Sequence, residues 1–177
     1  LAADPAHREA LERLRKALRD WMEQIRDTGL LPEPEMLARS AGRSPYDMAR
    51  DGKSYDYPRV RDAAEAAGEL RPDGLAGWVK HFDDADSAVR YWAAVGCVRL
   101  GKDAAAARPA LEKALADPCW SVRIAAAEAV AALGGLDRAL PVLIEAMKSD
   151  EPAVARLAGN VLDFLGEQAR PALDVVR

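Results

Sequence analysis

The chain has 177 residues, half of them hydrophobic and 6% aromatic, and its net charge is −4. Lys and Arg total 25 against 29 Asp and Glu, so the chain lacks the basic excess that nucleic acid or an anionic membrane favours. No apolar run approaches the ~18 residues of a membrane span. Ala (37) and Leu (20) far outnumber Val, Ile and Thr together (16), which predicts an all-α fold.

The first expected element is an amphipathic helix that starts at Pro5, behind a capping Asp4, and ends at Gly29. Its apolar residues recur at steps of three and four, which places them on one face. We interpret this segment as a docking helix whose apolar face is core. A helix lying on a membrane surface is the alternative, although the basic and acidic residues balance. The face consists of Leu11, Leu14, Leu18, Trp21 and Ile25.

Residues 30–57 are expected to form an irregular segment that wraps over another surface. The run Leu30–Glu35 contains two prolines, so it should not be helical throughout. A short helix capped by Ser44 is expected to end near Gly52. We take residues 1–57 as one region, a helix followed by an extended segment. Its candidate interface residues are Leu14, Leu18, Trp21, Tyr46, Tyr55 and Tyr57.

Residues 58–177 are expected to form a stack of helical repeats, opened by a helix at Pro58. Three columns of residues recur with a period of 33, which indicates a repeat array. The units are about 73–101, 106–134 and 138–166, and a helix over 167–177, with Ala169, Leu173 and Val176, should cover the end of the stack. The columns are Trp78, Leu111 and Ile144; Asp84, Asp117 and Asp150; and Arg90, Arg123 and Arg156.

Each unit is expected to contain two helices, because a short turn separates two apolar stretches. Ser87 and Ser121 are the expected caps of the second, Ala-rich helices. A Gly after the last Leu of each unit should supply a left-handed ending. A single pair of this length cannot bury its own apolar face, so the units must stack.

The Asp and Arg columns are interpreted as a structural ladder. In this hypothesis each Asp caps the following helix and pairs with an Arg of its own or the adjacent unit. The equal numbers of Asp and Arg at a fixed offset favour this internal pairing. The alternative is a row of arginines that grips sulfate or phosphate groups.

The pattern Asp-x₅-Arg-φ-x-Ala-Ala, over about residues 75–177, resembles HEAT repeats of the short kind named after phycobilisome lyases. That resemblance implies an α–α superhelix, a fold that serves many tasks. HEAT-like DNA glycosylases use Trp and Asp on a basic face, which this chain lacks. A bilin lyase would need a pocket with an acid or a reactive Cys. Trp92 occupies the column of Ala125 and Ala158, so we expect it to fill space between units, and we expect Cys97 to be a buried small hydrophobe.

The stretch LRKALRDWMEQIRDTGLLPEPEM resembles the helix and exit loop near the C-terminus of bacterial sulfatases of the alkaline phosphatase superfamily. Ser44-Pro45-Tyr46 and Tyr57-Pro58, followed by helical repeats, resemble sulfatases that end in HEAT-like repeats. The matching residues of the helix and loop are Leu14, Leu18, Trp21, Asp27, Gly29, Pro32, Glu33 and Glu35.

The sulfatase resemblance implies a non-catalytic C-terminal region that covers a catalytic domain, shapes access to it or makes an oligomer contact. Sulfatases convert the Cys or Ser of Cys/Ser-x-Pro-x-Arg to formylglycine beside a calcium ion. Cys97, Cys119 and Ser44 do not fit that motif. We therefore expect no catalytic, cofactor or metal residue in this chain, and no hydrolysis of aryl sulfates by it alone. Calcium and formylglycine would belong to a separate catalytic domain.

The expected partner is a protein: the chain's own catalytic domain or a second copy. The sulfatase resemblance would place the protein in the periplasm or outside the cell. The alternative function is a stand-alone HEAT-repeat adaptor that binds another protein. A Cys/Ser-x-Pro-x-Arg motif encoded upstream of Leu1 would favour the sulfatase hypothesis over the adaptor.

Overall fold

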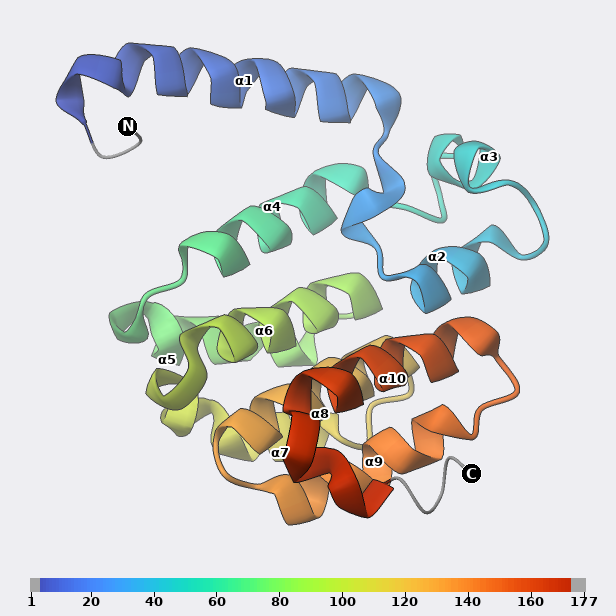
Figure 1. Cartoon of the computed structure of the whole chain (residues 1–177). Coiled ribbons are helices and arrows are strands. Elements are labelled where there is room, and N and C mark those ends of the chain that lie inside the picture. The colour runs from blue at the N-terminus through green and yellow to red at the C-terminus, as the bar shows by residue number, and fades with distance from the viewer. Residues whose placement is uncertain (1–3, 173–177) are drawn as a thin grey trace.

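A computed structural model describes residues 4–172 of the chain, and the elements in this range are helices joined by short loops. No strand occurs within that range, as the composition predicts. Short 3₁₀ segments join the α-helices (Figure 1). The helices are α1 (Arg8–Ile25), α2 (Glu33–Ser40), α3 (Pro45–Arg50), α4 (Tyr57–Glu69), α5 (Leu75–Trp78), α6 (Ser87–Leu100), α7 (Arg108–Ala114), α8 (Trp120–Ala132), α9 (Leu136–Met147) and α10 (Pro152–Leu165).

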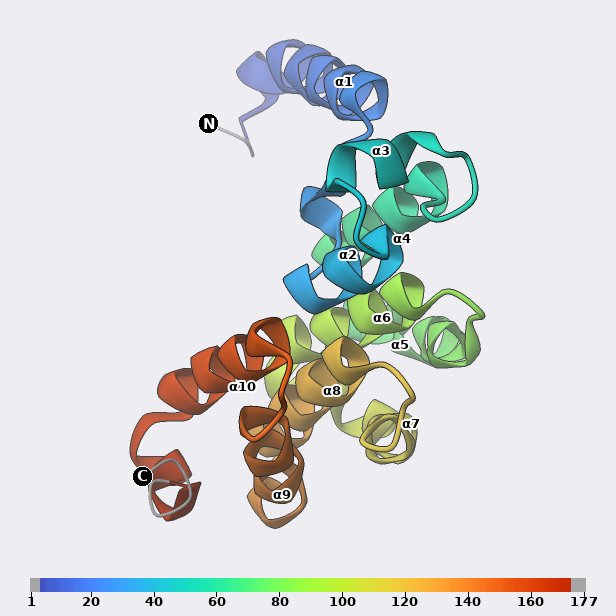
Figure 2. The same cartoon turned by 90° about the vertical axis from the view of Figure 1, so that its right-hand side faces the viewer.

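From α5 onward the chain is a stack of helical pairs. The first pair is α6 with α5, which a 3₁₀ turn over Val79–Asp83 extends. The pairs α7–α8 and α9–α10 follow. The second helices α6 and α8 pack side by side, and α4 continues this layer beyond α6 (Figure 2). The predicted all-α superhelix of stacked pairs is therefore confirmed.

Small residues let the helices of this stack approach closely. Ala93 and Ala94 of α6 and Ala126 and Ala129 of α8 are all buried. The indole Nε1 of Trp78 donates a hydrogen bond of 3.0 Å to the carbonyl oxygen of Ala93. A large aromatic ring can reach the backbone of a neighbouring helix only where the side chains between them are small.

Gly96→Ala tests this close packing. A Cβ atom at Gly96 would lie 3.0 Å from Nε1 of Trp78 and 3.1 Å from two of its ring carbons. Overpacking costs about 1–3 kcal/mol, and the better helix propensity of Ala returns up to about 1 kcal/mol. We expect urea denaturation to show a net loss of about 1–2 kcal/mol. Gly77→Ala is the control, since its Cβ would have no atom within 4 Å; equal losses for both variants would contradict the packing argument.

A glycine with positive φ follows the last leucine of each unit, as predicted. The φ angles are 56° at Gly101, 83° at Gly134 and 56° at Gly166. Residues with a Cβ atom rarely adopt this backbone conformation. These glycines end the second helices and turn the chain toward the next unit.

The predicted serine caps were wrong. Asp86 caps α6, because its backbone is extended (φ −83°, ψ 119°) and its carboxylate accepts a 2.8 Å hydrogen bond from the backbone nitrogen of Ala88. Ser87 is the first residue of the helix. In the next unit α8 begins at Trp120, so Ser121 lies within the first turn, buried and with a hydroxyl that has no hydrogen-bond partner.

The first helix also differs from its predicted bounds. Asp4 caps a 3₁₀ turn over Pro5–His7, and α1 follows it. The helix ends at Ile25, before Gly29, because Arg26 adopts a left-handed conformation with φ 54°. Gly29 instead lies in a separate 3₁₀ turn.

The segment 30–57 is more regular than predicted. Helix α2 starts at Glu33, since Pro34 falls in its first turn, where no backbone donor is needed. The predicted cap at Ser44 is confirmed by a 3.1 Å hydrogen bond from the nitrogen of Asp47 to its hydroxyl. The segment builds a second small core with the start of α6: Leu31, Met48, Ala49, Tyr55, Tyr57, Val60 and Ala88.

The helix predicted to cover the end of the stack is a 3₁₀ helix over Gly166–Ala172 in the part that the structure describes. Gly166 breaks the preceding helix with its positive φ, and Pro171 lacks a backbone donor. Ala169 is buried, as expected. Leu173 and Val176, the other residues of that prediction, lie outside the described residues.

Candidate interaction surfaces

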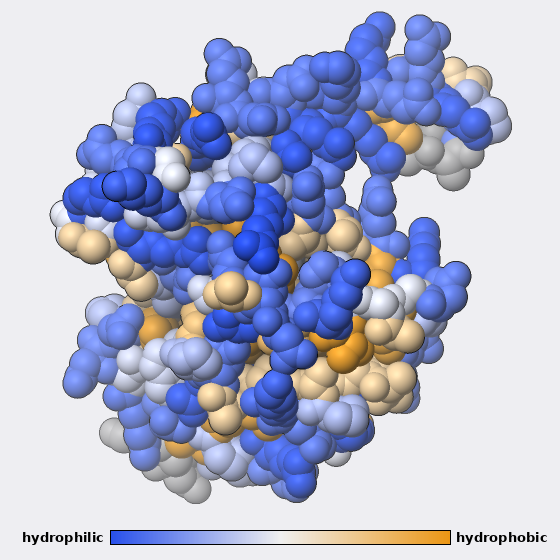
Figure 3. All heavy atoms as spheres, turned by 180° about the vertical axis from the view of Figure 1, so that it is seen from behind, coloured by the Kyte–Doolittle hydropathy of each residue, from blue (hydrophilic) through white to orange (hydrophobic). Residues whose placement is uncertain are grey.

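Helix α1 projects from the rest of the molecule and has no buried residue. Leu14 is 63% exposed, and Leu18 and Trp21 are each 59% exposed. Figures 1 and 2 show α1 at one end of the structure, beyond α4. In the space-filling view a hollow separates part of α1 from the body of the molecule (Figure 3). The predicted apolar face is thus bare on one side of an outlying helix.

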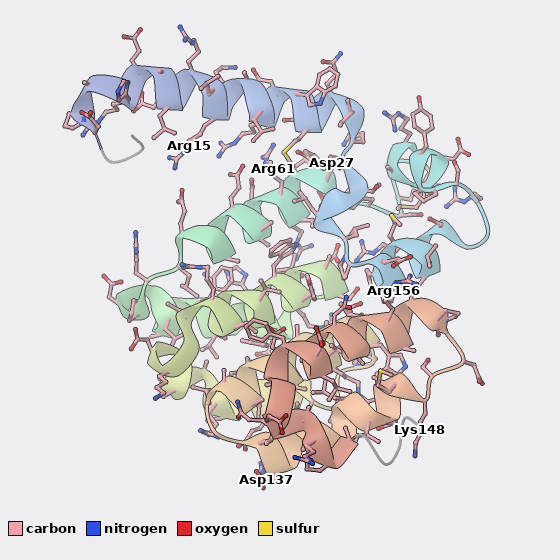
Figure 4. The ribbon with its side chains drawn as sticks, in the orientation of Figure 1. Arg15, Asp27, Arg61, Asp137, Lys148 and Arg156 are labelled. Atoms are coloured by element: carbon pink, nitrogen blue, oxygen red, sulfur yellow. The ribbon has the colours of Figure 1, made fainter. Side chains whose placement is uncertain are left out.

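Ion pairs, more than apolar packing, hold α1 over α4. Arg19 donates from Nε to Oε1 of Glu65 at 3.1 Å, and Arg61 of α4 donates to Oε2 of Glu23 at 3.1 Å. Arg15 and Arg61 extend into the space between the two helices (Figure 4). Such exposed pairs are each worth under about 1 kcal/mol, so they orient α1 without covering its apolar face.

Of the three candidate tyrosines, only Tyr46 lies on the surface. It is 64% exposed, and the guanidinium carbon of Arg50 stacks 3.7 Å from the centre of its ring. Tyr55 and Tyr57 are buried in the second core, and the Tyr55 hydroxyl donates a 2.7 Å hydrogen bond to the carbonyl oxygen of Asp27. Tyr55 and Tyr57 therefore stabilise the fold and are not interface residues.

The Asp and Arg columns meet at one junction between units. Arg90 donates to both carboxylate oxygens of Asp117 in the next unit, at 2.7 and 2.9 Å. It also donates to the backbone carbonyl of Asp84 at 2.8 Å. The carboxylate of Asp84 pairs instead with Arg59 of α4, at 2.8 and 2.9 Å.

The other two arginines of the column have glutamate partners. Arg123 donates to Glu145 of α9 at 2.7 Å and stacks on the ring of Trp120, 3.8 Å from its centre. Arg156 of α10 pairs with Glu33 of α2. Asp150, the expected partner of Arg123, is exposed on the connecting loop. The predicted pairing within the columns therefore holds at the Arg90–Asp117 junction alone among the described residues. The predicted caps were wrong, because the N-cap positions of α6, α8 and α10 are Asp86, Cys119 and Glu151. Each arginine is paired with a carboxylate, which disfavours the alternative of a row that grips anions.

A polar cluster forms where α2 lies against the starts of α6 and α8. The carboxylate of Glu35 accepts hydrogen bonds from Arg39 Nε at 2.8 Å and Cys119 Sγ at 2.9 Å, and a third from Ser87. Arg39 also pairs with Asp86. This cluster was not predicted from the sequence. Its one local signal is the Glu35–Arg39 pair at i and i+4, a spacing that has meaning only in a helix, and residues 30–57 were expected to be irregular.

The cluster fixes the charge state of its members. Burial opposes ionisation of Glu35, but hydrogen bonds from Cys119, Ser87 and Arg39 outweigh it and lower the pKa of this carboxyl. Burial and the neighbouring Glu35 raise the pKa of the Cys119 thiol to about 11. Burial alone raises the pKa of Cys97 to about 11. At neutral pH both cysteines are protonated thiols, and such thiols are poor nucleophiles.

A groove of about 390 Å³ remains beside the cluster. Its walls come from α2 and from the starts of α6, α8 and α10. The buried hydroxyl of Ser121, which has no hydrogen-bond partner, belongs to this lining. The other lining residues include Pro34, Glu35, Ala38, Ser87, Arg90, Cys119, Trp120 and Glu151.

Within residues 4–172, no group of three or more His, Cys, Asp or Glu side chains is arranged to hold a metal ion. Over the same range, no helix is both long enough and apolar enough to span a membrane.

The repeat region matches a family model. The model for HEAT repeats matches residues 75–163, from the start of α5 to near the end of α10. No curated protein matches the chain. Stacked helical repeats of this kind build extended surfaces that bind other proteins. With half of its length matched, and with the stacked pairs in place, this chain belongs to the HEAT-repeat family.

Proposed function

We propose that this HEAT-repeat protein is a protein-interaction module that docks through the apolar face of α1. The observation that carries the proposal is the exposure of Leu14, Leu18 and Trp21, on an 18-residue helix without a buried residue. An isolated helix of this length is marginal in water, because most helical stability comes from packing of its apolar face. An aligned apolar surface that is left bare typically marks an interface.

The spacing of the apolar residues indicates the shape of the partner surface. The exposed Leu14, Leu18 and Trp21 and the half-buried Ile25 follow steps of four, three and four, the anchor pattern of a helix that lies in an apolar groove. The repeat stack is a rigid support for such a helix, and the ion pairs to α4 set its direction. The partner surface belongs to another domain or to a separate protein.

A sulfatase catalytic domain is the second candidate partner, and the place of α1 favours it. The helix that resembles the sulfatase C-terminus is the part of this chain that its own repeats leave uncovered, whereas Glu33 and Glu35 of the exit loop contact the repeats. In this proposal α1 would pack against the catalytic domain, and the repeats would extend from it. The test is the reading frame upstream of Leu1: a Cys/Ser-x-Pro-x-Arg motif supports this partner, and an unrelated domain removes it.

Leu14→Glu should separate docking from folding. Leu14 is exposed, so the variant should unfold within about 0.5 kcal/mol of the wild type. Loss of an apolar anchor should weaken the partner complex at least about tenfold, as for other interface hot spots. The partner is first trapped in cells with a photoreactive residue at position 14. Affinity is then measured on the purified pair.

Position 16 supplies the control for this experiment. Lys16 is exposed on the polar side of α1, where it pairs with Asp20 at 2.6 Å. Lys16→Gln changes the charge by the same one unit as Leu14→Glu but should leave affinity unchanged. Equal cross-linking from positions 14 and 16, or equal affinities of the two variants, would contradict docking through the apolar face.

A further inference from the structure

We propose that the starts of α6, α8 and α10 form a second binding surface, for an acidic helical segment of another protein, and that α2 occupies this surface within the chain. We call the surface the α2 seat. The inference is independent of docking through α1. The seat consists of Asp86, Ser87, Cys119, Ser121 and Arg156.

The α2 helix makes at least one polar contact with each of the three repeat units, and Arg39 adds further contacts with Asp86 and Ser87 of the first unit. Its Glu35 accepts hydrogen bonds from Ser87 in the first unit and, at 2.9 Å, from Cys119 in the second. Its Glu33 accepts a 3.1 Å hydrogen bond from Nε of Arg156 in the third. Figure 4 shows Arg156 between α10 and α2. The short helix α2 thus crosses three successive repeats, as a helical ligand bound to the repeat surface would do.

The charges of the seat select a segment with two carboxylates and one basic side chain, because Asp86 pairs with Arg39 of α2. The N-terminal ends of α6 and α8 carry the positive ends of their helix dipoles, which favour carboxylates. Arg156 adds a full positive charge, 54% exposed in its side chain. The two glutamates of α2 contact these groups, so a competing segment must place two carboxylates in the same way.

The fit between α2 and the seat is incomplete. A groove of about 390 Å³ remains between them. Ser121, 1% exposed, lines this groove, and its hydroxyl has no hydrogen-bond partner. On the α2 side the groove is lined by Pro34 and Ala38, which are small. A segment with larger polar side chains at these positions would fill the space and pair the Ser121 hydroxyl.

The contacts of α2 with the seat are also of a kind that can be exchanged. The side-chain contacts described above are ion pairs and hydrogen bonds. Pro34 of α2 is buried, but Leu37, its large apolar residue, is 49% exposed. The Arg39 pairs with Glu35 and Asp86 are largely buried. A buried ion pair contributes little net stability, because desolvation offsets the attraction. A partner with better packing, and with a basic side chain for Asp86, would therefore displace α2.

The test uses full-length chains and a labelled peptide. The probe is a fluorescein-labelled peptide with the sequence of residues 30–44. In one chain Glu33→Ala, Glu35→Ala and Arg39→Ala together vacate the seat. We expect fluorescence anisotropy to show at least tenfold tighter binding to the vacated chain than to the wild type. Adding Arg156→Glu to the vacated chain should reverse that gain, as should a probe with Gln in place of both glutamates.

Equal binding to the wild-type and vacated chains would overturn the proposal, as would equal binding of the probes with Glu and with Gln at positions 33 and 35. Circular dichroism checks that the variants fold. If the vacated chain does not fold, hydrogen exchange of the wild-type chain decides: α2 must exchange faster than α6, α8 and α10, and equal protection would overturn the proposal. Leu14→Glu should not change peptide binding, so failure here leaves docking through α1 untouched.

Discussion

Arg90→Ala is expected to lower the free energy of unfolding by about 3–5 kcal/mol. The side chains of Arg90 and Asp117 are 12% and 9% exposed, so the variant leaves a buried carboxylate without its partner. It also removes a hydrogen bond to the carbonyl of Asp84, which closes the turn before α6. Because the pair joins two repeat units, thermal unfolding should shift by about 10 °C for a chain of this length.

Arg123→Ala is the matched control, because it removes the same residue type one repeat later. Its partner Glu145 is 60% exposed, so the freed carboxylate stays in water and the pair should contribute under about 1 kcal/mol. Loss of stacking on Trp120 adds about 1 kcal/mol. Similar losses of stability for Arg90→Ala and Arg123→Ala would contradict this prediction, because they would show that the burial of the partner carboxylate does not determine the cost of removing the arginine.

The repeat stack could be predicted because its signals are local and periodic. Each unit ends in Leu-Gly, and the chain at this point needs a positive φ that few residues other than glycine adopt. Gly101, Gly134 and Gly166 therefore mark the ends of the units in the sequence. The Ala-rich second helices have a composition that suits only closely packed helices. Asp86 and Ser87 show the limit of this reasoning: both can cap a helix, and the choice between them depends on backbone angles set by the preceding turn.

The candidate surfaces depended on contacts between distant parts of the chain. The apolar face of α1 could be predicted from spacing, but the expectation that it is core was wrong for Leu14, Leu18 and Trp21, which are exposed. Glu35 lies 52 residues from Ser87 and 84 from Cys119, and no periodicity links them. Tyr55 and Tyr57 were candidates for the surface because tyrosines suit interfaces. They are buried because α4 and the start of α6 close over them.

Trp92→Ala is expected to lower the free energy of unfolding by about 3 kcal/mol, at the low end for a Trp because the side chain is only partly buried. Trp92 replaces the alanines of its column, and its ring packs against both the repeat core and the second core. Its Nε1 donates a 2.9 Å hydrogen bond to the carbonyl oxygen of Leu30, just before α2. The ring therefore joins the N-terminal segment to the stack, a wider role than filling space between units.

The variant Trp92→Phe separates the two contributions of this residue. It keeps most of the apolar contact and loses the hydrogen bond, so it should cost about 1 kcal/mol of the free energy of unfolding.

Hydrogen exchange should show the effect of Trp92→Ala first in α2 and α3, because these helices lose their anchor on α6, while α8 and α9 stay protected. Uniform loss of protection through the stack would contradict this role and make Trp92 a residue of the repeat core alone.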